Sequence, residues 1–243
     1  MVNVMDETIG LRLIEELKED TERFRKEGGA YRLLQEYFDG LSRETLRDLL
    51  SFEDKSIRQI TLWIISELGE TAKDLLEEIA SQMNDDDPLI CYYSSEIVAC
   101  FATDRYMDDF MRVFAFFEYS NAKIRQLSMF IISKLTDSRI QEAYAYAVNN
   151  KILSDSHEKG LLALININTL TTSDITAMIN SNDSIIRKYG ILAASKVYGR
   201  YPEIIEESIN SEDLDIQDFS KIKMQAEVKI SQLPKYAEKS FKI

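Results

Sequence analysis

Apolar and small side chains recur along much of the chain at intervals of three and four residues. In the segment 54–68 they stand 3, 7, 11 and 14 positions after the first residue, as Ile57, Thr61, Ile65 and Leu68. Residues at these intervals lie on one face of an α-helix, because each residue turns the helix by about 100°. The pattern therefore predicts a helix over 54–68 with one buried face.

The same segment occurs again further along the chain. Residues 121–135 and 183–197 align with it without gaps, 87–101 is a fourth copy, and two degenerate copies follow. The six copies start at positions 54, 87, 121, 155, 183 and 213, so the successive spacings are 33, 34, 34, 28 and 30 residues. Each copy starts with Asp or Asn. These side chains accept backbone N–H groups of the first helical turn, which predicts N-capped helices.

Shorter helical patterns lie between the copies, so each repeat is predicted to be a helix pair. The intervening helices are expected over 42–50, 71–83, 104–118, 138–149, 173–180 and 202–210. Ahead of the first repeat, one amphipathic helix is expected over 6–26 and another over 30–38, each followed by glycine. We interpret this N-terminal pair as a cap that closes the first repeat.

Composition favours an all-helical fold. Gly and Pro number 8 and 3, together 11 of 243 residues, whereas an average composition would give about 29. So few turn-forming residues argue against a many-stranded sandwich or barrel. Apolar residues make up 45% of the chain, which is enough for a core and argues against disorder.

The motif Asp-x-x-Ile-Arg at the start of the copies resembles that of HEAT-type helical repeats, over roughly residues 41–230. The matching arginines are Arg58, Arg125 and Arg187. The spacing also suits tetratricopeptide or ankyrin arrays, but their signature motifs do not occur in this sequence. The resemblance implies an all-α fold: a right-handed α-α superhelix, or HEAT-like solenoid, of about five to six helix pairs with an N-terminal helical cap. It also implies that these arginines pair with the Asp of a neighbouring repeat.

On this interpretation the whole chain, 1–243, is a single solenoid domain. Its parts are an N-terminal helical cap over 1–40, helical repeats over 41–212, and a degenerate C-terminal capping repeat and tail over 213–243. The repeat boundaries after residue 150 stay open, because the copies there are degenerate.

The two cysteines and the lack of targeting signals predict a cytoplasmic protein. Cys91 and Cys100 stand nine residues apart in one expected helix, and therefore on opposite faces, where they cannot form a disulfide. The N-terminus has no basic region, and the longest apolar runs are six residues, far below the roughly 20 that span a bilayer. We expect no membrane association.

The sequence carries few residues suited to catalysis or metal binding. The only histidine, His157, is expected to be an exposed or capping residue at a helix start. HEAT-like metal hydroxylases rely on repeated His-Glu pairs, and this chain has one such pair. The run Asp85-Asp86-Asp87 is interpreted as a turn ending in an N-cap, since it lacks the glycine and terminal glutamate of a calcium loop. We expect no metal, no cofactor and no enzymatic activity.

The resemblance implies that the second helix of each pair lines a concave surface, where a partner would bind. Positions 5, 9 and 13 of each copy should point away from neighbouring helices. From these positions we predict a partner-binding set made up of Gln59, Trp63, Glu67, Tyr92, Glu96 and Phe130. Trp63 is the only tryptophan, and Trp is enriched among residues that dominate interface energetics. The alternative is that it packs in the core, which is also expected for the aromatic residues of 106–119.

The formal charge of −13 is unevenly distributed. Residues 1–109 contain 12 basic and 26 acidic side chains, a net charge of −14, whereas the remainder contains 17 and 16, a net charge of +1. An acidic end suits a basic protein partner, because complementary potentials speed encounter. The alternative is that the charge serves solubility alone. A nucleic acid is not expected, since phosphate binding requires a concentrated basic face.

These observations favour a non-enzymatic protein–protein interaction module. It is expected to bind a basic protein on the concave face of its N-terminal half. The chain is similar to short bacterial HEAT-repeat proteins, some of which are immunity partners that block a toxin. The alternatives are an enzyme or lyase that uses carboxylates such as Glu67 and Glu96 as acid and base, and a nucleic-acid binder on the same scaffold.

Overall fold

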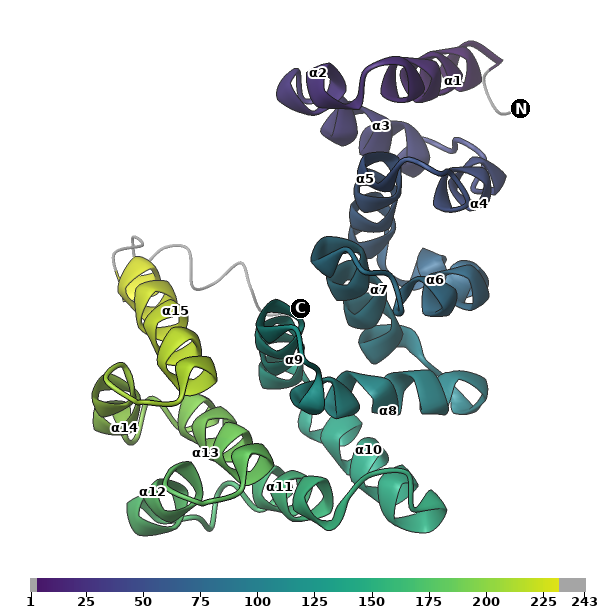
Figure 1. The fold of residues 1–243 in the computed structure, drawn as a ribbon. Coiled ribbons are helices and arrows are strands. Elements are labelled where there is room, and N and C mark those ends of the chain that lie inside the picture. The colour runs from purple at the N-terminus through teal and green to yellow at the C-terminus, as the bar shows by residue number, and fades with distance from the viewer. Residues whose placement is uncertain (1–3, 232–243) are drawn as a thin grey trace. The chain divides into compact units, whose positions relative to one another are not determined.

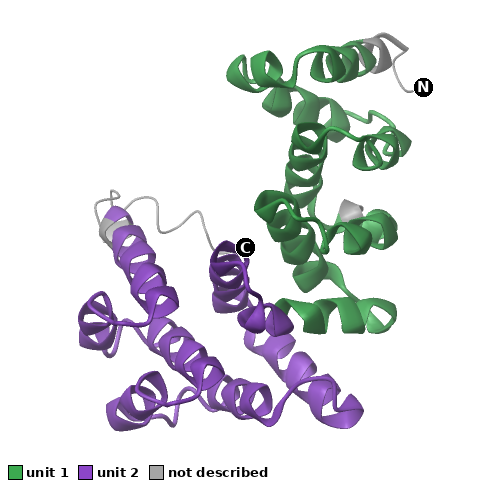
Figure 2. Ribbon diagram, in the orientation of Figure 1, with its two compact units in different colours: residues 1–113 green, residues 114–243 purple. Residues whose placement is uncertain are grey.

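The computed structural model describes residues 4–231, which form α-helices and short 3₁₀ helices and contain no β-strand (Figure 1). The all-helical prediction is therefore confirmed for this part of the chain. The chain divides into two compact units, residues 1–113 and 114–243 (Figure 2). The division falls near the end of one helix, within the region 104–118 that the repeat pattern assigns to a single helix.

Unit 1 is built from two layers of helices. Helices α3, α5 and α7 pack against one another in succession, and α1, α4 and α6 cover them in the same order. The elements are α1 (Val4–Glu19), α2 (Thr21–Lys26), α3 (Gly29–Phe38), α4 (Glu44–Leu50), α5 (Lys55–Glu67), the 3₁₀ helix η1 (Gly69–Leu75), α6 (Leu76–Gln82), α7 (Pro88–Phe101), the 3₁₀ helix η2 (Asp104–Tyr106) and α8 (Met107–Ala115). The predicted arrangement of helix pairs is recognisable in this alternation.

The local features that the repeat pattern predicts are present in unit 1. The Asp54 carboxylate accepts the backbone N–H of Ser56 at the start of α5, and Asp87 caps α7 in the same way. On α5, Ile57, Thr61 and Ile65 are buried, as their spacing requires. The Thr61 hydroxyl donates to the carbonyl of Ile57 at 2.8 Å, so this small polar side chain is satisfied inside the core.

Unit 2 continues with helix pairs but closes on itself. Its elements are η3 (Phe116–Glu118), α9 (Ala122–Lys134), α10 (Asp137–Asn150), α11 (Asp155–Ile165), α12 (Thr172–Ile179), α13 (Ser184–Lys196), α14 (Pro202–Ser208) and α15 (Leu214–Ser231). Helix α13 packs against α11, α12, α14 and α15, as expected for consecutive repeats. In addition, α9 packs directly against α13 and α15, which lie two and three repeats further along the chain.

An ionic cluster joins the three helices of this closure. Arg125 of α9 donates from Nε and Nη2 to the two carboxylate oxygens of Asp215 on α15, at 2.8 and 3.1 Å. The Lys188 ammonium of α13 lies 3.4 Å from the same carboxylate. Lys188 and Asp215 are buried. The fork of two parallel hydrogen bonds is the strong geometry for a guanidinium and a carboxylate.

The predicted arginine ladder is formed only in part. Arg187 pairs with Asp213, the first residue of the following copy, at 2.8 Å. Arg58 pairs at 2.7 Å with Asp85, two positions before the first residue of its neighbouring copy. Arg125 does not pair with the next repeat but reaches Asp215, 90 positions later. The neighbour pairing expected for Arg125 is therefore wrong, because α15 occupies the space beside α9.

Three predicted helices are interrupted, and the one expected over 104–118 consists of η2, α8 and η3. The helix expected over 6–26 breaks at Asp20, whose carboxylate caps the separate helix α2 by accepting the backbone N–H of Arg23. The helix expected over 71–83 starts as the 3₁₀ helix η1 and becomes α-helical only at Leu76. The predicted core position is confirmed for Phe110, Phe114 and Phe117, which are buried, but not for Tyr119, which is 43% exposed. No described helix is both long and apolar enough to cross a bilayer.

Candidate functional site

The outward face of α5 carries three polar or amphipathic side chains one helical turn apart. These are Gln59 and Trp63, both half-buried, and Glu67, which is exposed. A helix rises about 1.5 Å per residue, so Gln59 and Glu67 lie about 12 Å apart along the axis. Trp63 stands midway between them, and the face therefore has a polar start, an aromatic centre and an acidic end.

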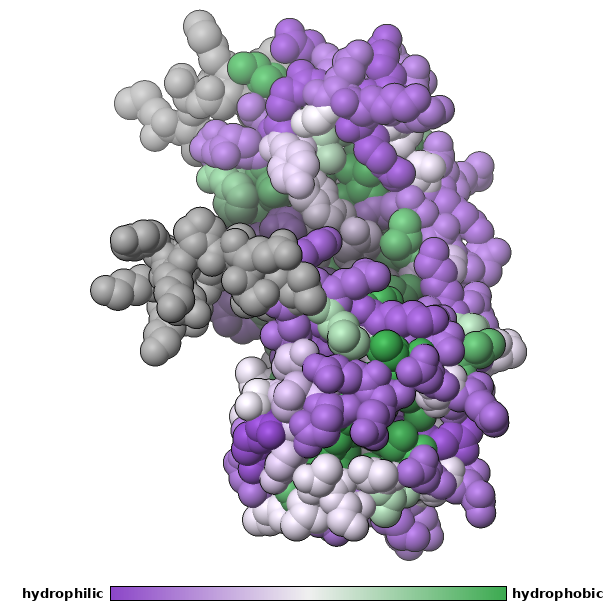
Figure 3. Space-filling model, turned by 90° about the vertical axis from the view of Figure 1, so that its left-hand side faces the viewer, coloured by the Kyte–Doolittle hydropathy of each residue, from purple (hydrophilic) through white to green (hydrophobic). Residues whose placement is uncertain are grey.

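A pocket of about 390 Å³ opens beside Trp63 on unit 1. Four helices contribute to its lining, and the principal residues are Arg25 of α2, Tyr31 of α3, Gln59, Ile60 and Trp63 of α5, and Leu89 and Tyr93 of α7. In the upper part of Figure 3, pale and green side chains lie together with purple ones around them. The pocket is thus an apolar patch within a charged surface.

Aromatic rings form the wall of the pocket. The Tyr31 and Trp63 rings meet edge to face, with centroids 4.9 Å apart and planes at 71°. Tyr31 is 71% exposed, so its ring is held mainly by Trp63 rather than by the core. Tyr93 lines the pocket from α7 and is half-buried. Large aromatic side chains that stay open to solvent are the typical anchors of a protein interface.

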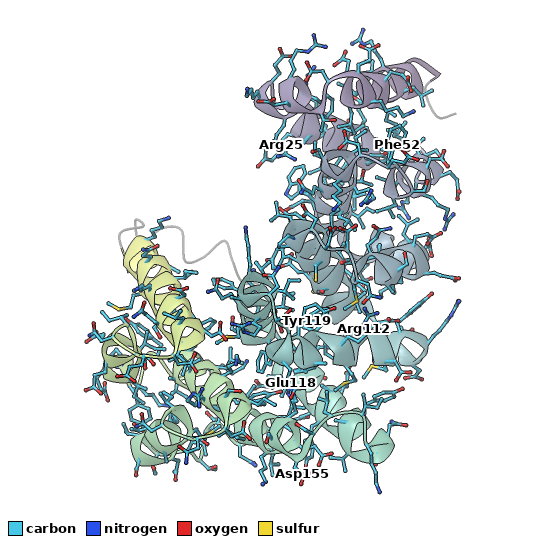
Figure 4. All side chains as sticks on the ribbon, in the orientation of Figure 1. Arg25, Phe52, Arg112, Glu118, Tyr119 and Asp155 are labelled. Carbon is cyan, nitrogen blue, oxygen red and sulfur yellow. The ribbon has the colours of Figure 1, made fainter. Side chains whose placement is uncertain are left out.

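A sharp turn brings the N-terminal helices to this pocket. Gly28 joins α2 to α3 with a backbone φ of 73°, in the left-handed region that disfavours residues with a Cβ. The turn places Arg25 before it and Tyr31 after it on the same pocket. Figure 4 shows Arg25 on α2 near the start of α5. The helix pair predicted as a mere cap thus supplies half of the site.

The basic end of the pocket is fixed by a chain of hydrogen bonds. Arg25 Nη2 donates to the Gln59 side-chain oxygen at 3.2 Å, and Gln59 Nε2 donates to an Asp87 carboxylate oxygen at 2.9 Å. Asp87 in turn caps α7. Within residues 4–231 Arg25 has no carboxylate at ion-pair distance, so its guanidinium keeps an uncompensated charge at the pocket rim.

Two carboxylates outside the pocket lining, Glu67 of α5 and Glu96 of α7, act electrostatically on Tyr93, which lines the pocket. The Tyr92 hydroxyl donates to Glu96 at 3.0 Å, and burial together with this carboxylate raises the Tyr92 pKa. Burial also raises the pKa of the Tyr93 phenol; the charges of Glu96 and Glu67 raise it further, and Arg25 lowers it. The Tyr93 phenol therefore lies within electrostatic reach of Arg25 and of both carboxylates. Glu67 forms no ion pair in the described part of the chain.

The structure brings together some of the predicted site residues and separates others. Gln59 and Trp63 line the pocket, whereas Glu67, Tyr92 and Glu96 do not. Phe130 belongs to unit 2, where its half-buried ring packs against Phe219 of α15, with centroids 5.9 Å apart. The sequence did not indicate the other pocket residues, which include Arg25, Lys26, Tyr31, Leu89 and Tyr93.

For α13, the helix of the copy that starts at Asp183, the prediction that positions 5 and 9 point away from neighbouring helices is wrong. Lys188 and Leu192, at positions 5 and 9 of that copy, are both buried. The reason is the closure of unit 2, in which α13 packs against α9 and α15. The equivalent row of α9 is also engaged within the unit, since Gln126 donates to Asp218 at 2.8 Å.

The exposed or capping position predicted for His157 is also wrong. Its side chain is 1% exposed, and Nδ1 lies 3.1 Å from the Tyr189 hydroxyl. Phe117 and Tyr189 pack against the imidazole ring. Burial lowers the His157 pKa to about 4. Within the described residues no group of three His, Cys, Asp or Glu side chains is placed to hold a metal ion.

The carboxylates predicted for acid–base catalysis, Glu67 and Glu96, are not among the residues that line the pocket, and an enzymatic role for them stays a prediction. In comparisons with known proteins, no family model and no curated protein sequence matches this chain.

Proposed function

We propose that this protein is a non-enzymatic binding module and that the unit 1 pocket holds a segment of a protein partner. The single observation that carries the proposal is the aromatic wall of Tyr31, Trp63 and Tyr93 around a pocket open to solvent. Pockets of about 300–1,000 Å³ with apolar walls and a few polar groups are typical binding sites.

Energetics support an anchoring role for Trp63. Its ring is in contact with Tyr31 and is only partly covered, so a partner that covers both rings removes further apolar surface from water. Burial of such surface contributes about 25 cal/mol per Å². Trp and Tyr side chains in this situation commonly account for about 2 kcal/mol or more of binding energy when they are truncated.

The charge distribution supports a basic partner. Residues 1–113 contain 13 basic and 26 acidic side chains, a net charge of −13, whereas residues 114–243 contain 16 of each. The whole net charge of the protein therefore belongs to the unit that carries the pocket. A basic partner is attracted to this unit, and anionic competitors such as nucleic acids are repelled.

Within this proposal, the helix pairs are parts of a right-handed HEAT-like solenoid, and the protein acts as an immunity or inhibitor protein by analogy with short bacterial HEAT-repeat proteins. The alternation of helices in unit 1 and the arginine pairs of Arg58 and Arg187 support the first part. A cytoplasmic location is supported by two free thiols, Cys91 and Cys100.

The proposal is tested by capture of a partner from the native host on immobilised protein. A bound protein is expected to elute with salt, because surface charge attraction is screened over about 10 Å at 0.1 M ionic strength. Trp63→Ala is expected to weaken its binding by about 30-fold or more, equivalent to about 2 kcal/mol. Tyr31→Ala, at a position too exposed to support the core, is expected to weaken binding in the same direction.

Phe38→Ala is the matched control. Phe38 lies on α3, like Tyr31, is 59% exposed, and does not line the pocket. Its loss should leave binding within about twofold of the wild type, as for energetically neutral surface positions. If the Phe38 and Tyr31 variants lose affinity equally, or neither pocket variant loses any, the pocket is not the binding site.

A further inference from the structure

The pocket is lined by a basic side chain near the start of α5, and an acidic side chain lies beyond the lining near the end of the same helix. Arg25 stands at the level of Gln59, to which it is hydrogen-bonded at 3.2 Å. Glu67 stands two helical turns further along α5, about 12 Å away along the axis. Neither side chain has an oppositely charged partner at ion-pair distance within residues 4–231. Two uncompensated charges of opposite sign thus lie on either side of Trp63 along α5, Arg25 within the pocket lining and Glu67 beyond it.

We infer that the pocket recognises a short extended segment with an acidic residue, a large apolar residue two positions away, and a basic residue two positions further. This inference rests on the proposed function. The acidic residue faces Arg25, the apolar side chain enters the pocket beside Trp63, and the basic residue faces Glu67.

The spacing follows from the geometry of an extended chain. Each residue of an extended segment advances about 3.3 Å, so four residues span about 13 Å, close to the separation of the two charged ends. Side chains at alternate positions of such a segment point to the same side. Residues one, three and five can therefore face Arg25, Trp63 and Glu67 together.

The chemistry at each end favours one sign of charge. The Arg25 guanidinium offers a fork of N–H donors to a carboxylate, a geometry that an ammonium ion cannot use. At the other end, Glu67 is exposed and forms no ion pair within the described residues. A Lys or Arg side chain placed there is attracted by its carboxylate.

This local order of charges differs from the general acidity of unit 1. General acidity alone favours the most basic segment, with basic residues at both ends. The pocket instead requires one acidic residue within a basic partner, because a second basic residue would meet Arg25. The two explanations therefore predict different preferred ligands.

The test uses the full-length protein and three amidated, acetylated five-residue peptides: Glu-Thr-Leu-Thr-Lys, Lys-Thr-Leu-Thr-Lys and Glu-Thr-Leu-Thr-Glu. Trp63 is the only tryptophan, so its fluorescence reports binding at this pocket. The mixed peptide is expected to bind tightest, by about two- to fivefold over each of the others, as for exposed charge pairs.

Charge reversal in the protein supplies the decisive comparison. In Arg25→Glu the preference should change to the peptide with two lysines, and in Glu67→Lys it should shift towards the peptide with two glutamates. Arg25→Gln should abolish the advantage of the mixed peptide over the two-lysine peptide without reversing it. Both positions are at the surface, and unchanged circular dichroism would show that the variants are folded.

Other results would overturn the inference. If the two-lysine peptide binds tightest to the wild type, or if Arg25→Glu does not change the order, the pocket binds peptides by general attraction only. If no peptide changes Trp63 fluorescence while Trp63→Ala still abolishes partner capture, the pocket binds a partner surface rather than an extended segment. If Trp63→Ala has no effect on capture either, the proposed function fails as well.

Discussion

At the scale of single residues, the most unusual environment belongs to His157. Its imidazole lies between Phe117 and Tyr189 in unit 2, with Nδ1 at 3.1 Å from the Tyr189 hydroxyl. Within the described residues its Nε2 has no hydrogen-bond partner. Asp183 favours the protonated ring and Lys188 opposes it, but burial is the dominant cause that lowers the His157 pKa to about 4.

This environment predicts that unit 2 loses stability in mild acid. An unfolded chain protonates histidine below about pH 6.5, whereas folded His157 stays neutral down to about pH 4. The unfolded state therefore binds more protons between these values, and the free energy of unfolding falls as the pH falls from 6.5 to 4. At pH 4.5 the loss relative to pH 7 should be roughly 2–3 kcal/mol.

Urea denaturation at pH 7 and pH 4.5 measures this loss. His157→Phe removes the titrating ring and should reduce the fall in the free energy of unfolding between pH 7 and pH 4.5 by that amount. The substitution should also lower the free energy of unfolding at pH 7 by about 1–2 kcal/mol, because the buried Tyr189 hydroxyl loses its partner. Carboxylates that titrate near pH 4.5 affect wild type and variant alike. Equal pH dependence in both proteins would show that His157 is accessible to protons in the folded state.

At the scale of elements, the pairing of α9 with α15 decides the structure of unit 2. The fork between Arg125 and Asp215, the bond from Gln126 to Asp218, and the contact of Phe130 with Phe219 all join these two helices. A face of α9 that consecutive repeats would leave open is therefore covered by a helix of the same unit. The difference from α5, whose face is open, explains why the candidate site lies in unit 1.

This pairing predicts a strong effect of Asp215→Asn on stability. The substitution leaves Arg125 and Lys188 with uncompensated charges at a buried position, and breaking such an ionic cluster costs about 3–5 kcal/mol. Asp218→Asn, on the next turn and bonded within the described residues only to the neutral Gln126, should cost about 1 kcal/mol. Urea denaturation followed by circular dichroism compares the two variants, and similar losses would refute the structural role of the ionic cluster.

The helices themselves were predictable because their signals are local. The caps formed by Asp54 and Asp87, and the buried stripe of α5, follow from residues within one or two turns. The pairing of Arg125 with Asp215 has no such signal, because it joins positions 90 apart and Asp215 falls in a degenerate copy at a position that no pattern marks. The prediction that each repeat packs only against the next one is therefore wrong for α9, which packs against α13 and α15.

The candidate site was predictable to a similar extent. Helical register identified Gln59 and Trp63 on α5. On α7 it favoured Tyr92, whereas Tyr93, rotated by about 100°, lines the pocket. Arg25 and Tyr31 were missed because the N-terminal helix pair lies outside the repeat register, so that nothing in the pattern relates its faces to those of α5.

At the scale of the whole molecule, charge and aromatic character have different kinetic consequences for binding. The net charge of −13 on residues 1–113 acts at long range and attracts a basic partner before contact. The aromatic wall acts only after the partner has docked. Association and dissociation should therefore depend on different residues.

For a captured partner, the association rate constant should fall about tenfold or more as ionic strength rises from low to physiological values, because screening shortens the reach of the charge. Trp63→Ala should leave this rate within about twofold and accelerate dissociation by about 30-fold. Surface plasmon resonance at several salt concentrations separates the two effects. An association rate that is independent of salt would show that the acidity of unit 1 serves solubility alone.

The closure of unit 2 also has a consequence for the order of folding during synthesis. Contacts between α3, α5 and α7 join segments roughly one repeat apart, so unit 1 can complete its core as soon as its last helix leaves the ribosome. In unit 2 the partner of Arg125 is made 90 residues later, and at about 5–20 residues per second α9 waits several seconds for α15. The nascent chain therefore has a finished pocket in unit 1 while α9 is still exposed and dependent on residues not yet translated.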